Sequence, residues 1–345
     1  MGSILIDRWL GEQERVHILD EASIAIAREW VRREGRALGL PEVVTGAVVN
    51  VASELGYNQL AHARGGHICV RAVRRGDVPG LEVVAADDGP GIARPTEVLR
   101  GHGPGGGGRR PGASLGIGLA AVVELSDETD FDVRLGEGTC VWARKFAAPA
   151  PRRRQVGAYG RACVNEATTG DDGLFARGDE TLLVAVADGL GHGAPARQAS
   201  TRAIDVLAQA GGAPLDRALL QCHAALAGTR GAVVSAVRID EPGGGAEVAC
   251  VGNVSVHVYG IGASRRFSGP SFVLGAAGRT PRVTLEPMPL GARDVVAVFS
   301  DGLSTRTDIE GELDLLLREH PVAIAHQLVE RFGRANDDAL VLVVR

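Results

Sequence analysis

The feature that most limits how this chain can fold is a short segment near its middle that suits neither a helix nor a strand. Residues 147–155 read AAPAPRRRQ, with two prolines, three consecutive arginines and no apolar periodicity. Such a composition is typical of a linker. At 345 residues the chain is also long for one compact domain. We therefore predict two domains, residues 1–146 and 156–345, joined by a Pro/Arg linker at 147–155.

Composition indicates an ordinary globular protein, with 45% hydrophobic and 23% charged residues. The net charge of −5 argues against a nucleic-acid binder, which usually carries a basic surface. Charges interrupt the N-terminal segment, and no apolar run approaches the roughly 20 residues of a membrane span. The five cysteines are too scattered for a zinc site or a disulfide framework. We expect a cytoplasmic protein that binds neither nucleic acid nor membrane.

The first half has the pattern of an α/β domain. A glycine-rich segment at 101–112 can form neither helix nor strand, and we interpret it as a lid over a bound ligand, although a plain disordered insert has the same composition. The expected elements are helices at 20–38, 41–63 and 116–125, strands at 67–74 and 81–86, and a hairpin around Gly136. The second half has many short Val/Ala-rich strands, with helices near 194–209 and 213–227. That pattern favours a layered α+β sandwich.

Two segments of the first half carry polar residues suited to a nucleotide. Glu54 and Asn58 are four residues apart, so they share one face of the second helix. A carboxylate beside a carboxamide suits a base next to a magnesium ligand, although most such pairs are solvated polar faces. Asp87 ends an apolar strand, where its carboxylate can accept a hydrogen bond from the amino group of adenine. Gly89 and Gly91 follow it and allow close backbone approach, or simply form a tight turn.

A third segment, GASLGIGLAAVVEL, places Gly116 and Gly118 at the start of a helix. The unpaired N–H groups and the dipole of a helix N-terminus favour a phosphate. One Gly-x-Gly alone is weak support for a phosphate site. The three segments in this order, with the glycine-rich segment between the second and the third, together predict a nucleotide pocket.

This order, Glu-x-x-x-Asn, Asp-x-Gly-x-Gly, lid and Gly-x-Gly, resembles the GHKL ATPase superfamily. Over roughly residues 5–146 the first domain is most similar to the anti-sigma-factor serine/threonine kinases, in particular the RsbT-like stressosome switch kinases. The resemblance implies a GHKL-type α/β sandwich that binds ATP and Mg²⁺. Glu54 would be the general base and Asn58 a magnesium ligand. The remaining nucleotide-binding residues would be Asp87, Gly89, Gly91, Gly116 and Gly118.

The chain has a single lysine, Lys145, which excludes a P-loop because that motif needs a lysine for the phosphates. Any cationic help in phosphoryl transfer must therefore come from arginine. Arg109 and Arg110 in the glycine-rich segment are candidates.

Acidic residues recur at the ends of apolar strands in the second half. Asp-Gly pairs most often form turns, but four such acidic groups each next to a β-rich run favour a shared role. Several carboxylates brought together at strand ends can hold two hard cations, and ions about 3.5–4 Å apart can activate water against a phosphate monoester. The groups are Asp171-Asp172, Asp188-Gly189, Asp301-Gly302 and Asp337-Asp338.

The phrase VADGLGHG and the order of these groups resemble the metal-dependent serine/threonine phosphatases of the C type, especially the SpoIIE and RsbX-like branch. The resemblance covers roughly residues 156–345 and implies an αββα sandwich with two Mn²⁺ or Mg²⁺ ions. Asp188 would bridge both ions and the carbonyl of Gly189 would complete one coordination shell. The remaining acidic ligands would be Asp171, Asp301 and Asp337.

Three other residues of the second half carry weaker expectations. His192 could act as a general acid, but we expect a turn residue in its Gly-His-Gly setting. Asn253 is expected to hold a sheet or turn position without a role in the site. Arg161 is a loose candidate for binding the substrate phosphate, which eukaryotic members of the phosphatase family bind with an upstream arginine.

Together these patterns predict a bifunctional partner-switching regulator. Its kinase domain would phosphorylate a serine or threonine of a STAS-domain antagonist or scaffold protein of a stressosome-type module. Its phosphatase domain would remove phosphate from the same class of protein. The alternative is an ATP-gated module that binds a sigma factor or activates a downstream signalling enzyme, fused to an active phosphatase.

Overall fold

The computed structural model describes residues 4–101, 118–164, 166–241, 244–260, 264–304, 309 and 311–345. The chain divides into two compact units, Met1–Gln155 and Val156–Arg345. The proline- and arginine-rich segment belongs to the first unit and is anchored there. Arg75 donates a hydrogen bond to the carbonyl oxygen of Pro151 (2.9 Å), and the N–H of Arg153 donates to Glu128 (3.1 Å).

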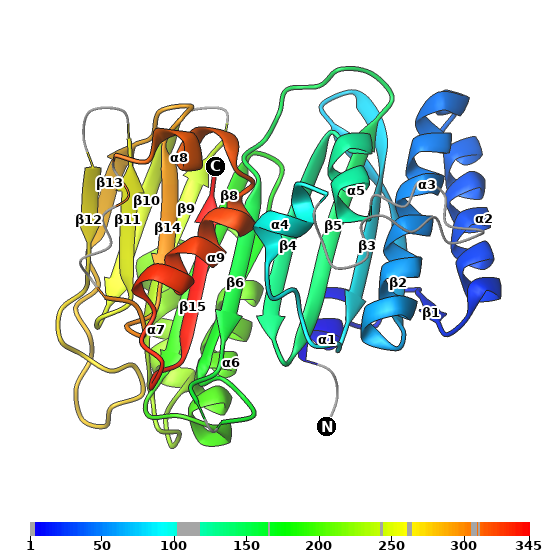
Figure 1. Cartoon of the computed structure of the whole chain (residues 1–345). Helices are drawn as coiled ribbons and strands as arrows, with labels where there is room; N and C mark the ends of the chain where they lie inside the picture. The colour runs from blue at the N-terminus through cyan, green and yellow to red at the C-terminus, as the bar shows by residue number, and fades with distance from the viewer. Residues whose placement is uncertain are drawn as a thin grey trace. The chain divides into compact units, whose positions relative to one another are not determined.

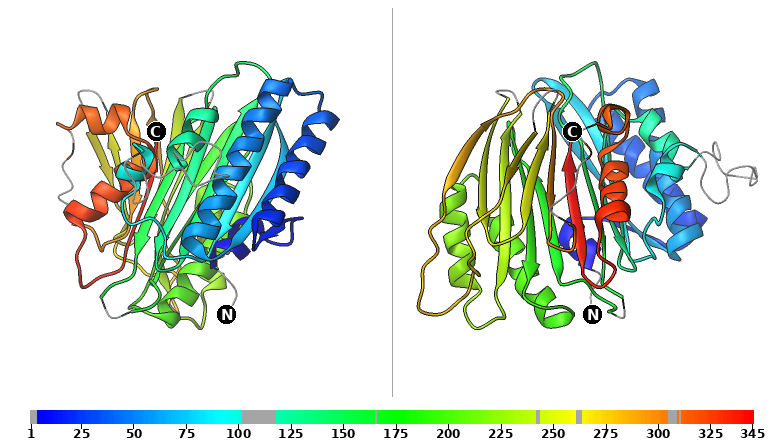
Figure 2. Two further views of the ribbon diagram at one scale, coloured as in Figure 1. Left: turned by 45° about the vertical axis from the view of Figure 1, so that its right-hand side comes forward. Right: turned by 60° about the vertical axis from the view of Figure 1, so that its left-hand side comes forward.

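The N-terminal unit is an antiparallel sheet with α2 and α3 packed against it (Figure 1). Its strands are ordered β1-β2-β3-β5-β4, and the left view of Figure 2 shows α2 and α3 lying side by side. The strands are β1 Val16–Ile18, β2 Gly66–Arg75, β3 Val78–Asp87, β4 Glu128–Leu135 and β5 Gly138–Phe146. The helices are α1 Ile4–Leu10, α2 Glu21–Ala37, α3 Glu42–Asn58, the π-helix η1 Gln59–Ala63, α4 Pro95–Leu99 and α5 Leu119–Leu125.

Local sequence explains why these helices begin where they do. Asp20 and Ser23 form a reciprocal capping box at the start of α2, with bonds of 2.8 and 3.1 Å. Pro41 immediately precedes α3, where its fixed φ leads into the helix. The predicted helix at 41–63 changes character after Asn58, because its last turn widens into η1. The side chain of Gln59 there donates to the carbonyl oxygen of Ala86 at 3.1 Å, which ties the helix end to β3.

The C-terminal unit is a sandwich of two antiparallel sheets with helices on their outer faces (Figure 2). One sheet has the order β6-β15-β14-β11-β12 and is covered by α9, and the other has the order β13-β10-β9-β8-β7 and is covered by α6 and α7. The predicted α+β fold class, with its αββα second domain, is confirmed. The strands are β6 Val156–Arg161, β7 Asp171–Arg177, β8 Thr181–Gly189, β9 Ala232–Asp240, β10 Gly245–Val251, β11 Ser255–Tyr259, β12 Ser264–Phe267, β13 Leu285–Pro289, β14 Val295–Phe299 and β15 Ala339–Val344. The helices are α6 Ala194–Gln209, α7 Leu215–Ala225, α8 Leu313–Arg318 and α9 Pro321–Phe332.

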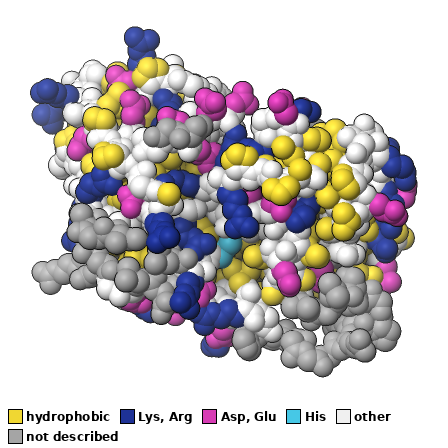
Figure 3. Space-filling view, turned by 90° about the horizontal axis from the view of Figure 1, so that it is seen from above, with side chains coloured by type: hydrophobic (Ala, Val, Ile, Leu, Met, Phe, Trp, Pro, Cys, Tyr) yellow, Lys and Arg dark blue, Asp and Glu magenta, His cyan; other side chains and the backbone are white. Residues whose placement is uncertain are grey.

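The surface and the interior have the side chains expected of an ordinary globular protein. The face seen in Figure 3 mixes basic and acidic side chains among apolar ones. All five cysteines are buried free thiols. Among the described residues, no helix combines the length and apolar character needed to cross a bilayer.

The packing of α9 on β6 depends on Gly157. A Cβ atom there would overlap the backbone nitrogen of Val322 in α9. We expect Gly157→Ala to lower the stability of the C-terminal unit by about 1–3 kcal/mol, since backbone cannot move aside as a flexible side chain can. Gly212→Ala is the matched control, because nothing lies within 4 Å of the added carbon.

Urea unfolding can be followed separately in the two units, because the three tryptophans, Trp9, Trp30 and Trp142, all belong to the first unit. Gly157→Ala should move part of the circular-dichroism transition to lower urea and leave the tryptophan transition in place. An unchanged circular-dichroism transition would contradict the packing argument.

Candidate functional sites

The N-terminal site forms where the end of α3 meets the start of α5. Glu54 is buried within α3, and Asn58 is the last residue of the helix. The Nδ2 of Asn58 is buried without a hydrogen-bond partner among the described residues. Gly118 caps α5 with φ +59°, and a Cβ on it would lie 3.9 Å from Oδ1 of Asn58. The first and third predicted segments therefore lie next to each other.

Asp87 closes the third side of this site at the end of β3. Its Oδ1 accepts hydrogen bonds from the N–H groups of Gly89 (2.9 Å) and Thr139 (3.3 Å). Burial raises the pKa of Asp87 to about 6, although these two hydrogen bonds act in the opposite direction. Because Gln59 binds the carbonyl of Ala86, the end of α3 is fixed beside Asp87.

The two glycines after Asp87 are required by close packing. A Cβ on Gly89 would lie 2.6 Å from Cβ of Ala63 in η1. Gly91 has φ +75°, and a Cβ there would lie 2.6 Å from the carbonyl oxygen of Arg134. Each glycine thus has a steric reason to be present, beside the expected approach to a nucleotide. Gly116, Arg109 and Arg110, and with them most of the segment interpreted as a lid, lie outside the described residues.

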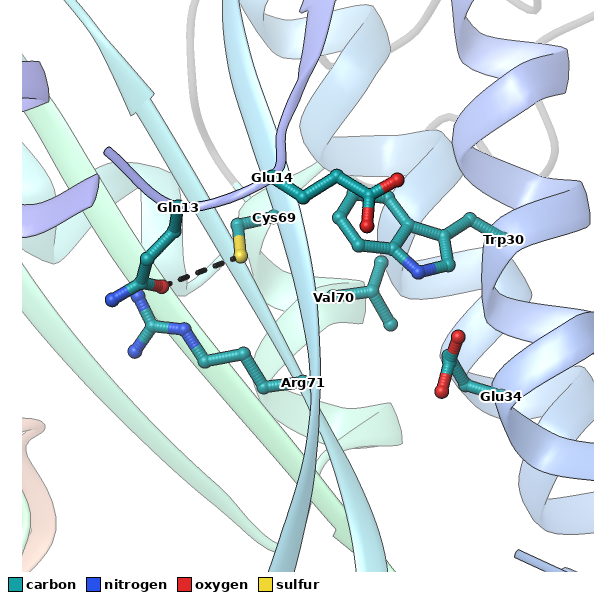
Figure 4. A pocket seen from close by; sticks show the side chains of 7 residues that line it. All are labelled: Gln13, Glu14, Trp30, Glu34, Cys69, Val70 and Arg71. Carbon is teal, nitrogen blue, oxygen red and sulfur yellow. Dashed lines mark hydrogen bonds between the residues drawn. The ribbon is translucent and has the colours of Figure 1, made fainter. Parts of the chain in front are cut away.

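These residues fit a nucleotide and a magnesium ion. The site combines a buried amide without a partner, a carboxylate acceptor at a strand end and a glycine that starts a helix. The lysine is committed elsewhere, since its Nζ lies 2.8 Å from Asp127. A separate cavity of about 280 Å³ in the same unit shares none of the predicted nucleotide residues. Figure 4 shows it lined by Gln13, Glu14, Trp30, Glu34, Cys69, Val70 and Arg71.

In the C-terminal unit, the pairing of β7 with β8 brings two predicted ligands together. The register makes Asp171 and Asp188 direct cross-strand partners. Asp171 is 1% exposed, whereas Asp188 lies at the partly open end of β8. Burial raises the pKa of Asp171 to about 8, and burial with the like charge of Asp171 raises the pKa of Asp188 to about 10.

Asp301 and Asp337 complete the acidic cluster. Both add negative potential at Asp188, and both belong to the order that the sequence predicted. Burial and the charge of Asp301 raise the pKa of Asp337. The four carboxylates therefore lie within electrostatic reach of one another.

Asp337 and Asp338 have different environments. Asp338 is buried, and its two oxygens accept the N–H groups of Cys163 (2.7 Å) and Gly170 (2.6 Å). The carboxylate of Asp337 accepts the N–H of Asp338 at 3.1 Å. Asp338 thus holds backbone in place, and Asp337 is the member of the pair with oxygen atoms available for a cation.

Two positioning residues were missed by sequence reasoning. Asn253 donates to Oδ2 of Asp301 at 2.5 Å, so the expectation that it has no part in the site is not supported by its geometry. Ser300 donates to Oδ2 of Asp171 at 2.5 Å, and its Oγ accepts the N–H of Leu340. The only signal in the sequence was the nearness of Ser300 to the predicted ligand Asp301.

The acidic cluster fits divalent cations bound largely through water. No three His, Cys, Asp or Glu side chains in the described parts of the chain are grouped tightly enough to hold one ion directly. Magnesium commonly binds through one or two carboxylates and keeps several waters. Burial, together with repulsion between the carboxylates, raises the pKa values of Asp171 and Asp188, and cations at the cluster would relieve the repulsion. Gly189, whose N–H donates to the carbonyl of Gly170 (3.3 Å), lies at the same strand end.

His192 and Arg161 also differ from their expected settings. The Nδ1 of His192 lies 2.7 Å from Oε1 of Glu166, and His192 itself is exposed. It is thus an oriented side chain in the loop after Asp188, and not merely a turn residue. Arg161 donates to the backbone carbonyls of Ala162, Asp337 and Arg334. Because these hydrogen bonds engage its guanidinium with the backbone around Asp337, Arg161 is a poor candidate for binding the substrate phosphate.

Comparison with known proteins assigns a family to each unit. Residues 19–145 match the histidine kinase-like ATPase domain family, and residues 178–345 match the stage II sporulation protein E (SpoIIE) family. The serine/threonine-protein kinase RsbT of Bacillus subtilis (strain 168) is 32% identical over 137 residues, which are 40% of this chain and 98% of RsbT.

Two of the solved structures that resemble the chain are informative here. One comes from work on the bacterial stressosome as a modular system adapted to control secondary messenger signalling. Its sequence is 29% identical, and the TM-score is 0.53. The match covers 56% of this chain and 100% of the matched chain. The other is RsbX in complex with magnesium, which is 21% identical with a TM-score of 0.50. The match covers 57% of this chain and 96% of the RsbX chain, and it shows a similarity of fold.

The chain is an enzyme with two catalytic units. The first is a protein serine/threonine kinase, and the second is a C-type protein serine/threonine phosphatase. The resemblance predicted from the sequence is confirmed. Because its N-terminal unit spans nearly the whole of RsbT, the chain belongs to the RsbT serine/threonine-protein kinase family.

The acidic cluster predicts a pH-dependent response to divalent ions. Asp171 and Asp188 have folded pKa values of about 8 and about 10, above the ordinary 3.8, so the stability they contribute is lost as the pH rises through those values. At about pH 8, millimolar Mg²⁺ should raise the Tm of the C-terminal unit by about 2–4 °C or more, the shift that about 1 kcal/mol gives in a domain of this unit's size. At about pH 6 the rise should be smaller, because protons compete with the ion.

Asp188→Asn should raise the Tm of the ion-free protein at about pH 8 and remove most of the response to Mg²⁺. Asp77→Asn is the control, since it removes an exposed carboxylate from the other unit. Thermal unfolding measured by calorimetry decides the matter. An equal response in Asp188→Asn and the unmodified protein would contradict an ion site at the cluster.

Proposed function

We propose that the chain is a bifunctional partner-switching regulator. Its N-terminal unit would phosphorylate a serine or threonine of a STAS-domain antagonist with ATP and Mg²⁺. Its C-terminal unit would remove that phosphate with two Mn²⁺ or Mg²⁺ ions. The supporting observation is that one chain carries both the adjacent Asn58, Asp87 and Gly118 and the cross-strand carboxylates Asp171 and Asp188.

In the kinase unit, burial and position support the proposed role of each residue. Glu54 is buried one helical turn before Asn58, so it can take the proton of an acceptor hydroxyl whose oxygen attacks the γ-phosphorus, with ADP leaving. Asn58 would hold Mg²⁺, and Asp87 would accept the adenine amino group. Gly89 and Gly91 would let the backbone approach the base, while Gly116 and Gly118 would lie at the phosphates.

In the phosphatase unit, the two ions would be held largely through bound waters by Asp188, the proposed shared ligand, together with Asp171, Asp301, Asp337 and the carbonyl of Gly189. Divalent ions held there would activate water and offset the charge of a phosphate monoester. Ser300 and Asn253 would fix the orientation of Asp171 and Asp301 through their hydrogen bonds.

The partner is proposed from chemistry and from kinship. The chain belongs to the family of a serine/threonine-protein kinase, and one similar structure comes from work on the bacterial stressosome. Together with the resemblance to the switch kinases, this supports a STAS-domain antagonist or scaffold of a stressosome-type module as substrate, within the cytoplasm. A sigma factor or a downstream signalling enzyme is a further class of partner to test.

The two activities can be separated by single substitutions. Purified protein is mixed with ATP and a STAS partner, and phosphate on the partner is followed over time. Asp188→Asn should slow dephosphorylation by about 100-fold or more and let phosphate accumulate, because it removes the carboxylate that both ions would share. If phosphate neither accumulates with Asp188→Asn nor leaves a pre-phosphorylated partner with the unmodified protein, the proposal fails.

Glu54→Gln distinguishes a kinase from an ATP-gated binding module. Loss of a general base should slow transfer by about 100-fold or more and leave binding of ATP and partner intact. Absence of transfer by the unmodified protein, with partner binding retained, would support the binding module instead.

Asp87 predicts a pH dependence of nucleotide binding. Its pKa of about 6 means that its carboxylate becomes protonated, and a weaker acceptor, as the pH falls through that value. Asp87→Asn should weaken ATP binding by about tenfold or more at neutral pH, the usual value of a hydrogen bond to a charged group. The affinity ratio of unmodified protein to variant should shrink by about fourfold between about pH 7.5 and pH 5.5. Calorimetric titration gives this ratio, in which the titration of ATP itself cancels; a constant ratio would contradict the role of Asp87.

A further inference from the structure

Arg230 lies at the same end of the sheet as the carboxylates of the phosphatase unit. In the antiparallel pairing of β8 with β9, Asp188 is opposite Val233 and Gly189 is opposite Ala232. The N–H of Leu190 extends this pairing by donating to the carbonyl of Gly231 at 3.0 Å. The next position along each chain brings Arg230 opposite Gly191, in the loop that directly follows Asp188.

The guanidinium of Arg230 lies across the backbone of this loop. A Cβ atom on Gly191 would lie 2.9 Å from Nη1 of Arg230, and Gly191 has φ +88°, a conformation that favours glycine. The turn that presents Arg230 is itself held. The Oγ1 of Thr229 donates to the carbonyl of Leu226 (2.7 Å) and accepts the N–H of Gly231 (3.0 Å). The arginine therefore projects from a fixed backbone.

The charge of Arg230 remains available to a ligand. Its side chain is exposed, and within the described chain it makes no ion pair and no hydrogen bond. Two other arginines near the acidic cluster are committed to backbone. Arg161 donates to three carbonyl oxygens, and Arg197 donates to those of Thr169 and Asp171. Arg334 is also exposed, but its charge acts on Asp337.

The opposite end of the loop has the reverse charge. A Cβ on Gly193 would lie 3.1 Å from Oε2 of Glu166, the residue that holds His192. A negatively charged group approaching the loop is thus repelled at the Gly193 end and attracted at the Gly191 end.

We propose that Arg230 binds the phosphate group of the phosphoserine or phosphothreonine that the C-terminal unit hydrolyses. This inference rests on the proposed phosphatase function. A guanidinium can donate two parallel hydrogen bonds to two oxygens of a phosphate. Because the chain has a single lysine, a cationic side chain for the phosphate has to come from arginine. Arg230 supplies this contact beside the loop that follows β8, and it makes no ion pair with the carboxylates, all within the described residues, that attract the ions. It takes the part that the sequence had loosely assigned to Arg161.

The test compares full-length protein with Arg230→Ala, Arg230→Lys, Arg334→Ala and Arg217→Ala. Arg217, exposed on α7, is the matched control because its loss changes the net charge equally. Hydrolysis of p-nitrophenyl phosphate and of a phosphoserine peptide is measured with Mg²⁺ present. Binding of inorganic phosphate is measured by calorimetry as a readout that needs no turnover.

Arg230→Ala should raise KM and the dissociation constant for phosphate about tenfold, with kcat changed by less than about threefold, since the lost contact is made equally before and during reaction. Arg230→Lys should restore part of the affinity. Arg217→Ala should stay within about twofold of the unmodified protein, and Arg334→Ala should raise KM less than Arg230→Ala does. The Tm shift with Mg²⁺ should be retained in Arg230→Ala.

Unchanged KM and phosphate affinity in Arg230→Ala would overturn the inference, as would a larger loss in Arg334→Ala. If the unmodified protein hydrolyses neither substrate, the phosphatase proposal itself fails. Phosphate binding then still decides whether Arg230 holds the anion.

Discussion

The structure of the C-terminal unit depends on carboxylates that repel one another and are nevertheless held together. Asp171 and Asp188 are cross-strand neighbours, and like charges directly opposite each other in a sheet are unfavourable. Both β7 and β8 are buried along most of their length, and a shift of one residue would turn their packed side chains to the opposite face, so neither strand can slip to relieve the repulsion. Apolar packing thus imposes the negative potential at the strand ends, and divalent cations are the ligands that relieve it.

The positions of the carboxylates at strand ends could be predicted from the sequence, but the hydrogen bonds that orient them could not. An Asp at the end of an apolar run predicts a side chain at a sheet edge, and antiparallel pairing then brings Asp171 to Asp188. Ser300 and Asn253 hold Asp171 and Asp301 through contacts 129 and 48 residues apart in the chain. Such pairings depend on tertiary packing, which no local pattern encodes. For the same reason the use of Arg161 by backbone carbonyls could not be predicted.

The N-terminal unit shows the same division between local pattern and tertiary contact. Helical periodicity predicted α2 and α3, and the capping box at Asp20 explains the start of α2. The widening of the last turn into η1 was not predictable, because the side chain of Gln59 binds the carbonyl of Ala86, 27 residues away. That contact fixes Asn58 beside the strand that ends in Asp87. The irregular turn is therefore part of what assembles the site, as π-helical turns often are.

Both sites handle phosphate, but they rely on different electrostatic means. The N-terminal site has an amide nitrogen at Asn58 without a hydrogen-bond partner among the described residues and a helix start at Gly118, and it would gain positive charge from a metal ion bound with ATP. The C-terminal site has an excess of carboxylates, which suits two cations but would repel an anionic substrate until those cations are present. A fixed arginine next to such a cluster is useful only if it stays unpaired with the carboxylates. The exposed position of Arg230 over Gly191 meets that condition, whereas the guanidinium groups of Arg161 and Arg197 are hydrogen-bonded to backbone carbonyls.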